Sequence, residues 1–241
     1  MNRKVLLILL AGWSLGIGTN VNAAEISANA SITTDYRFRG ISQGDRSMAI
    51  QGGFDLEYES GFYLGVWASN VTFSGAAIET DLYAGYGGNI SDSLSYDVGY
   101  MYYAYPEDDA SPDLDYQELY ASLSFSDATI GVAVSDDYFA KTGTFWYLYA
   151  DYGRDVAENL SLSFHVALNI FENDAKFTEF IGPADGDAGD GYLDYSVSLS
   201  TQQLGVDWGL AFVGTDLKKA DCFSGTKLCE NTIVLSVSKS F

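Results

Sequence analysis

From Glu25 onward, polar and apolar side chains alternate with a period of two. The even positions from Ile26 to Phe38 are mostly apolar, whereas the odd positions from Glu25 to Arg39 are polar. Successive side chains of a β-strand point to opposite faces, so this pattern predicts one strand with an apolar and a polar face. The alternation outlasts a typical soluble strand of about 5–6 residues and suits a tilted membrane-crossing strand, which needs about 9–11.

The same alternation recurs along the whole chain and predicts twelve strands. They are expected at residues 25–40, 48–59, 62–72, 78–89, 93–105, 115–126, 128–136, 143–154, 159–171, 190–201, 203–214 and 230–241. This series predicts an all-β fold, a transmembrane antiparallel up-and-down β-barrel, because a closed barrel pairs every backbone group that lipid would leave unsatisfied. The alternative is a secreted β-sandwich, which also alternates but has shorter strands.

The connections between these strands differ in length from one side to the other. Short turns are expected at 59–61, 89–93, 126–128, 155–159 and 201–203, and longer loops at 41–47, 73–77, 106–114, 137–142, 172–189 and 215–229. Short turns on one side and long loops on the other are typical of outer-membrane barrels. An even strand count then places both termini on the periplasmic side.

The first 23 residues predict an export signal. Arg3 and Lys4 precede the apolar stretch Val5–Gly18, and Val21 and Ala23 supply small residues for a cleavage site. The stretch is short for a membrane anchor. We therefore expect residues 1–23 to be a signal peptide and residues 24–241 to form one outer-membrane barrel.

Charge and composition narrow the choice of partners. The chain carries a net charge of −21, and the expected signal contains no acidic residue, so the exported part is more acidic still. Such a chain would repel phosphate backbones, which argues against nucleic acid as a partner. The 18 Tyr and 14 Phe argue against a disordered chain, because disordered chains are poor in aromatics.

The C-terminal strand and the aromatic residues at the strand ends are further features typical of membrane barrels. Phe241 ends the chain, with Val237, Leu235 and Ile233 on the same face, which resembles the terminal strand recognised by the barrel-assembly machinery; Lys239 departs from that pattern. Outward aromatics are expected at both interfaces, namely Phe38, Tyr100 and Tyr102 on the loop side and Tyr58, Phe62 and Tyr86 on the turn side. Such girdles predict contact with outer-membrane lipid and lipopolysaccharide.

Three stretches resemble a known family. They are residues 35–43 (DYRFRGISQ), 51–71 (QGGFDLEYESGFYLGVWASNV) and 79–86 (ETDLYAGY). Together they are similar to the TorF-type porins of proteobacteria, with the strongest match over residues 30–90. The resemblance implies an outer-membrane location and a channel role, without identifying a solute.

Charged side chains are expected on the inward faces of the strands. The candidate lumen-lining residues are Arg37, Arg39, Asp55, Glu57, Glu79, Asp81, Asp97, Glu118 and Asp151. Facing charges of both signs inside a barrel can select ions, and the excess of carboxylates predicts a preference for cations. Alternatively the charges pair with one another and fill a narrow interior.

The long loops hold an acidic set and the two cysteines. The acidic residues are Glu107, Asp108, Asp109, Asp113 and Asp115 in one loop and Asp185, Asp187 and Asp190 in another. They suit either divalent cations or, more simply, a solvated surface. Cys222 and Cys229 are the only cysteines, and export to an oxidising compartment predicts that they form a disulfide.

Catalysis has little support. His165 is the sole histidine, and Ser163 and His165 are expected on the inward face rather than on the lipid-facing surface that barrel phospholipases use. No glycine-rich loop leads from a strand into a helix, so no nucleotide cofactor is expected. The sequence therefore predicts a porin or passive channel for small solutes or ions, with no catalytic, cofactor or metal site; the alternative is a non-conducting barrel whose acidic loops bind a partner.

Overall fold

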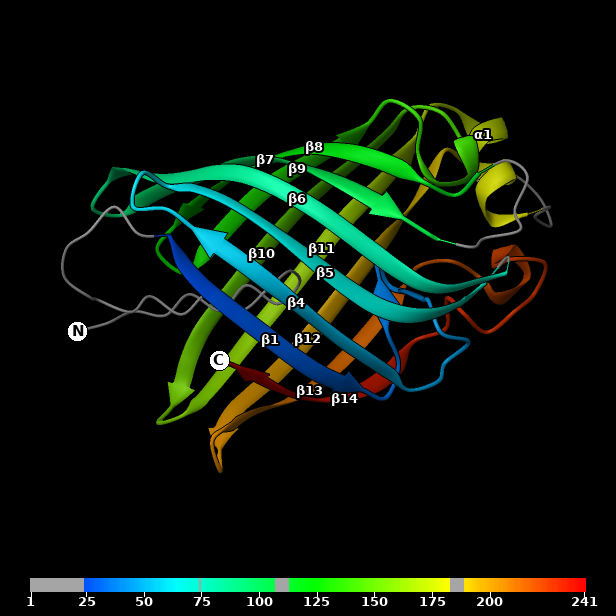
Figure 1. Ribbon diagram of the computed structural model, residues 1–241. Coiled ribbons are helices and arrows are strands. Elements are labelled where there is room, and N and C mark those ends of the chain that lie inside the picture. The colour runs from blue at the N-terminus through cyan, green and yellow to red at the C-terminus, as the bar shows by residue number, and fades with distance from the viewer. Residues whose placement is uncertain (1–23, 74, 107–112, 183–188) are drawn as a thin grey trace.

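The computed structural model describes residues 24–73, 75–106, 113–182 and 189–241. Twelve strands form one closed antiparallel barrel, in which each strand pairs with its sequence neighbours and β1 closes the ring against β14 (Figure 1). Their bounds are β1 Glu25–Thr33, β4 Ala49–Glu57, β5 Phe62–Phe73, β6 Ala76–Ser91, β7 Leu94–Ala104, β8 Tyr116–Phe125, β9 Ala128–Ser135, β10 Phe145–Ala157, β11 Leu160–Phe171, β12 Gly191–Gln203, β13 Val206–Thr215 and β14 Thr232–Ser240. The predicted signal peptide and the acidic residues Glu107, Asp108, Asp109, Asp185 and Asp187 lie outside the described residues.

The barrel confirms the prediction of twelve antiparallel strands, but the first strand was predicted too long. Eleven strands begin and end within three residues of their predicted bounds, whereas β1 ends at Thr33 instead of residue 40. Arg39 and Gly40 adopt positive φ values of 48° and 79° and turn the chain back on itself. The residues beyond Thr33 therefore form a small hairpin of β2 (Arg37–Phe38) and β3 (Ile41–Ser42).

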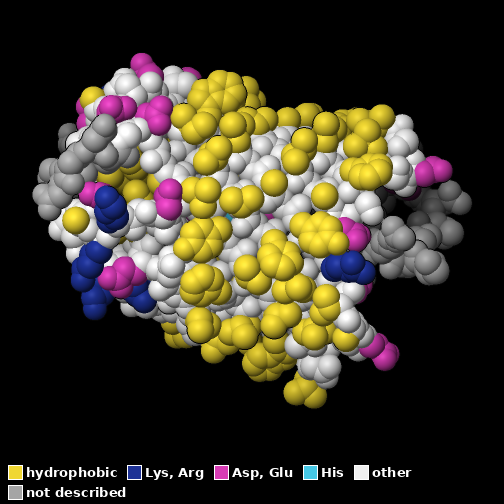
Figure 2. Space-filling view, turned by 180° about the vertical axis from the view of Figure 1, so that it is seen from behind, with side chains coloured by type: hydrophobic (Ala, Val, Ile, Leu, Met, Phe, Trp, Pro, Cys, Tyr) yellow, Lys and Arg dark blue, Asp and Glu magenta, His cyan; other side chains and the backbone are white. Residues whose placement is uncertain are grey.

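Apolar side chains cover the outer wall of the barrel, and charged ones gather toward its two ends (Figure 2). Exposed apolar residues from successive strands include Ile32, Phe54, Leu64, Leu82, Val98, Leu119, Ile130, Leu148, Val166, Leu199, Leu210 and Leu235. A water-soluble surface rarely exposes an apolar area of this extent, whereas the hydrocarbon of a bilayer requires it. Tyr58, Phe62 and Tyr86 are exposed near the turn-side ends of the strands, where they were predicted.

The long connections lie at the end of the barrel opposite the free ends of β1 and β14 (Figure 1). One of them contains α1 (Asp174–Ile181), an element that the sequence pattern did not predict. Asn173 caps it by accepting a hydrogen bond from the Lys176 backbone, and Phe177 and Ile181, one turn apart, are buried against the barrel end. Among the described residues, no helix is long and apolar enough to cross a membrane.

Inward tyrosines lie against glycines of the neighbouring strand. Tyr63 of β5 is paired with Gly85 of β6, and Tyr83 of β6 with Gly65 of β5. A Cβ atom on Gly65 would overlap the Tyr83 ring, and one on Gly85 would overlap the Tyr63 ring. The glycines thus leave room for large rings inside a barrel whose interior is narrow.

Candidate functional site

The loop-side half of the interior is filled by residues 34–48, here called the plug segment. The segment starts where β1 ends and returns to the wall at Ala49 of β4. Its Tyr36 and Ile41 are buried and pack with side chains from several strands, from the loop after β9 and from α1. Among these packed residues are Tyr103, Tyr105, Tyr116, Tyr138, Phe145, Phe171, Phe177 and Tyr192. Phe38, predicted as a lipid-facing girdle residue, instead packs inside against Tyr103, because the chain leaves the wall before it.

Arg39 lies at the centre of this packed region. Its Nη2 atom is 2.8 and 2.9 Å from the two carboxylate oxygens of Glu118 on β8. The guanidinium carbon also lies over the rings of Phe38, Tyr138, Phe145 and Tyr147 at 4.7, 5.5, 4.8 and 4.3 Å from their centroids. Arg39 is 5 % exposed, so its charge is balanced by one carboxylate and four aromatic faces.

Arg37 joins the plug segment to the disulfide loop between β13 and β14. Its Nε and Nη2 atoms contact Asp35 Oδ2 at 2.7 Å. Its Nη1 atom donates to the carbonyls of Gly40, Leu228 and Glu230 at 3.0, 2.7 and 3.1 Å. The two arginines predicted to line the lumen from the first strand therefore lie inside the barrel, but on a segment that fills it rather than on its wall.

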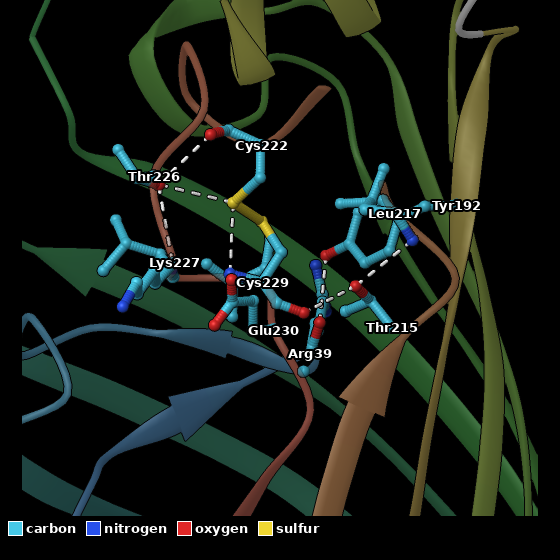
Figure 3. The surroundings of a disulfide bond; sticks show 12 residues. Arg39, Tyr192, Thr215, Leu217, Cys222, Thr226, Lys227, Cys229 and Glu230 are labelled. Atoms are coloured by element: carbon cyan, nitrogen blue, oxygen red, sulfur yellow. Dashed lines mark hydrogen bonds between the residues drawn. A yellow bond between two sulfur atoms is a disulfide. The ribbon is translucent and has the colours of Figure 1, made fainter. Parts of the chain in front are cut away.

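The predicted disulfide between Cys222 and Cys229 is confirmed, and it is buried rather than exposed on a surface loop. Figure 3 shows Thr226 bonded to Cys222 and Thr215 bonded to the Cys229 carbonyl, at 3.1 and 3.0 Å. Next to Cys229, the Leu228 carbonyl also accepts from the Ser42 backbone N–H at 3.0 Å. The bridge therefore braces the loop that holds the plug segment in place.

Two further predicted carboxylates, Glu79 and Asp81 of β6, lie in the same sealed region. Glu79 is 1 % exposed and accepts a 2.6 Å hydrogen bond from the Tyr36 hydroxyl. Asp81 is 2 % exposed, and within the described residues its Oδ1 atom has no hydrogen-bond partner. Tyr138, which lies beside Arg39 in the loop after β9, has its pKa raised to about 12 by burial, so its hydroxyl stays neutral.

His165 lies midway along the barrel, between the two ends. Its Nδ1 atom is 2.7 Å from Asp151, and its Nε2 atom is 2.8 Å from the Tyr147 hydroxyl and 3.1 Å from Asp194. Asp194, an inward carboxylate that no sequence motif marks, accepts a hydrogen bond from the Asn169 side chain at 2.7 Å. Both ring nitrogens of His165 are engaged with these groups and not with Ser163, so this cluster positions charge instead of a nucleophile.

The turn-side half of the interior is more open. Asp55, Glu57 and Asp97 are each partly exposed. Tyr83 donates to Asp55, and the Tyr63 hydroxyl lies 2.9 Å from Asp97. No Lys or Arg of the described residues forms an ion pair with these three carboxylates. This half therefore carries uncompensated negative charge that water reaches.

The loop acids that the structure describes serve local hydrogen bonds. Asp115 accepts from the Tyr102 hydroxyl and from the Tyr105 backbone N–H, both at 2.7 Å. Within the described ranges, no group of three or more acidic, histidine or cysteine side chains is arranged to hold a metal ion.

Comparison with known proteins finds a family model and solved porin structures of similar fold. A family model described as "Bacterial protein of unknown function (Gcw_chp)" matches residues 19–241, and no curated protein matches the sequence. The structure of "KdgM porin" is similar with a TM-score of 0.56 at 10% identity, covering 89% of this chain and 99% of that one. "KdgM porin in complex with disordered oligogalacturonate" has a TM-score of 0.54 at 10% identity over 90% and 98% of the two chains. The NanC porin has a TM-score of 0.51 at 8% identity over 89% and 98%. At these identities the likeness shows a shared fold.

Proposed function

The chain belongs to the bacterial family of unknown function Gcw_chp, and we propose that it is an outer-membrane channel through which small solutes or ions diffuse passively, with a preference for cations. In this proposal it is a TorF-type porin whose signal peptide, residues 1–23, is removed, and both termini of the barrel face the periplasm. The barrel contacts lipid and lipopolysaccharide, and its terminal strand, which ends at Phe241, is bound by the barrel-assembly machinery. No step of this function requires catalysis or a cofactor.

One observation carries the proposal: the water-accessible turn-side interior is lined by carboxylates that form no ion pair with a described Lys or Arg. Asp55, Glu57 and Asp97 lie there without a basic partner among the described residues. A ring of carboxylates in a pore attracts cations and repels anions. A polyanion such as the oligogalacturonate solved with the KdgM porin would therefore be disfavoured here.

The packed loop-side half supports a second candidate, a non-conducting barrel. Phe145 and Phe177 are fully buried there, and Arg39 is locked to Glu118. In the channel proposal, this packing describes a closed state in which the plug segment has to leave before solutes pass. In the alternative, the plug segment never leaves.

The two candidates differ in planar-bilayer recordings of the wild-type barrel and of a variant without its plug. Thr33 of β1 is already paired with Ala49 of β4, so residues 34–48 can be replaced by an Asn-Gly turn without changing the strand register. We expect discrete conductance steps that are small and infrequent in the wild type and larger in the variant. A folded plug-free barrel that gives no steps would establish the non-conducting alternative.

Selectivity is read from the reversal potential under a potassium chloride gradient. We expect cation selectivity in the plug-free barrel, and a shift toward zero when Glu57→Gln and Asp97→Asn are combined. Asp92→Asn, which removes an exposed carboxylate from a turn instead of the interior, is the matched control and leaves the potential unchanged. Anion selectivity of the plug-free barrel would contradict the cation preference.

A further inference from the structure

The side chains that surround the Arg39 guanidinium come almost entirely from residues outside the plug segment. Glu118 comes from β8, Tyr138 from the loop after β9, and Phe145 and Tyr147 from β10. Phe38 is the only one of the four surrounding rings that belongs to the plug. The barrel therefore supplies a cation site, and the plug supplies the cation.

A buried ion pair such as Arg39–Glu118 contributes little net stability to a packed segment. Replacing a buried ion pair with apolar side chains of similar volume is often neutral or stabilising, because the charges no longer have to be desolvated. Of the three guanidinium nitrogens of Arg39, Nη2 alone forms an ion pair with a carboxylate in the described part of the chain. Arg39 also adopts a φ of 48°, in the left-handed region that non-glycine residues rarely occupy. Recognition of a cation explains these features better than packing does.

We propose that Arg39 occupies, from within its own chain, the binding site for a solute that carries a guanidinium or alkylammonium group. The inference rests on the channel function proposed above and names its solute class. Glu118 supplies the two oxygens for the charged hydrogen bonds. Tyr138, Phe145 and Tyr147 supply the aromatic faces that attract organic cations. A carboxylate at this position would be repelled by Glu118. A neutral amide there would leave the buried charge of Glu118 without a counter-charge.

The site is tested first by ligand replacement in the full chain. Arg39→Ala removes the internal cation, and calorimetric titration with methylguanidinium chloride in detergent then measures binding to the vacated site. We expect millimolar binding to Arg39→Ala and none to the wild type. Adding Glu118→Gln weakens binding at least about tenfold, the factor that one charged hydrogen bond accounts for. Urea has the same planar shape without the charge and serves as the control ligand.

Arg46→Ala is the matched control variant, because the pair of Arg46 with Glu230 at 3.3 Å is about one-third exposed on both sides and no described aromatic ring lies over its guanidinium as over that of Arg39. Methylguanidinium binding to Arg46→Ala as tight as to Arg39→Ala would overturn the assignment, as would absence of binding to Arg39→Ala. If Arg39→Ala does not fold, Arg39→Gly, which also vacates the site and adopts the positive φ of this position without strain, takes its place with the same two outcomes.

A second measurement distinguishes a solute-binding site from a cavity that exists only because the Arg39 side chain was removed. In the plug-free barrel, methylguanidinium is expected to reduce the potassium current, and Glu118→Gln to abolish that block. A potassium current that methylguanidinium leaves unchanged would overturn the solute assignment while the channel function stands. A plug-free barrel with no current defeats the channel function, and the calorimetric result still decides whether the cation site exists.

Discussion

Removing Arg37 should release the plug segment while leaving the barrel closed. Arg37 is 7 % exposed and contacts Asp35 twice at 2.7 Å, besides three backbone carbonyls. Asp35 is 5 % exposed in the wild type, and the Arg37→Ala change leaves its carboxylate with the Ser42 hydroxyl, at 2.6 Å, as the one side-chain donor among the described residues. Breaking a buried ion pair by removing one partner costs about 3–5 kcal/mol. At about 1.4 kcal/mol per factor of ten, this shifts the docking equilibrium of the plug by about a hundredfold or more.

Amide hydrogen exchange measures that shift directly, because exchange from a locally opened segment reports its opening free energy. The Ser42 N–H donates to the Leu228 carbonyl and the Thr72 N–H of β5 donates to the Gln43 carbonyl, so both hydrogen bonds join the plug segment to its surroundings and are broken when the plug leaves. We expect their protection to fall about a hundredfold in Arg37→Ala, while the amides of β10 and β11 remain as in the wild type.

Arg46→Ala is the matched control for that measurement. Arg46 also contacts the disulfide loop, but its pair with Glu230 at 3.3 Å is about one-third exposed on both sides, and such pairs contribute about 0–1 kcal/mol. Its effect on the same amides should stay below about fivefold. Equal protection in Arg37→Ala and the wild type, or equal losses in the two variants, would refute the reasoning that Arg37 holds the plug.

Three further predictions concern the wall, the disulfide and the terminal strand. Gly85→Ala places a Cβ atom in overlap with the Tyr63 ring and should destabilise the barrel by about 1–3 kcal/mol. Gly87→Ala on the same strand is the control, because its Cβ atom meets its nearest neighbour at 3.3 Å. Heat-dependent gel mobility measures the unfolding temperatures of the two variants, and equal temperatures would contradict the packing described. Combining Cys222→Ser with Cys229→Ser removes a short loop closure, a loss of about 2–3 kcal/mol, and should lower the exchange protection of Ser42; unchanged protection would show that the bridge does not brace the plug. Phe241→Ala should reduce the amount of barrel in the outer membrane without affecting refolding in detergent, with Lys239→Ala as control; equal outer-membrane levels would argue against recognition of the last residue.

The wall of the barrel was predictable because one side chain in two has to face lipid. That constraint repeats along every strand, so the alternation located eleven strands within three residues of their bounds. It failed between Thr33 and Ala49 because the alternation continues through Phe38, although the chain has already left the wall. A period of two shows that residues are extended with two faces, but it does not distinguish lipid from a packed interior as the surroundings of the apolar face.

The interior site was less predictable than the wall, since its contacts join residues far apart in the sequence. Inward carboxylates such as Glu118 could be assigned to a face, yet nothing local indicates that Arg39 reaches Glu118 or that Tyr138 and Phe145 surround it. One local signal was present: Gly40 directly follows Arg39, and glycine readily adopts the positive φ that a tight turn of the chain requires. Asp194 had no such signal, because a single aspartate in an alternating strand looks the same whether it meets water or a histidine.

The connection between β1 and β4 is much longer than the pairing of these strands requires, and its length bears on the function of the barrel. Thr33 and Ala49 are hydrogen-bonded strand partners, so a two-residue turn would suffice to join them. The chain instead inserts residues 34–48 into the barrel and places a left-handed arginine among aromatic rings. A barrel that needed only to be full could use apolar side chains from its own strands, as it does with Phe145 and Phe171. A separate segment, held by Arg37 and a braced loop at one end of the interior, is what a barrel requires if that end has to be closed at some times and open at others.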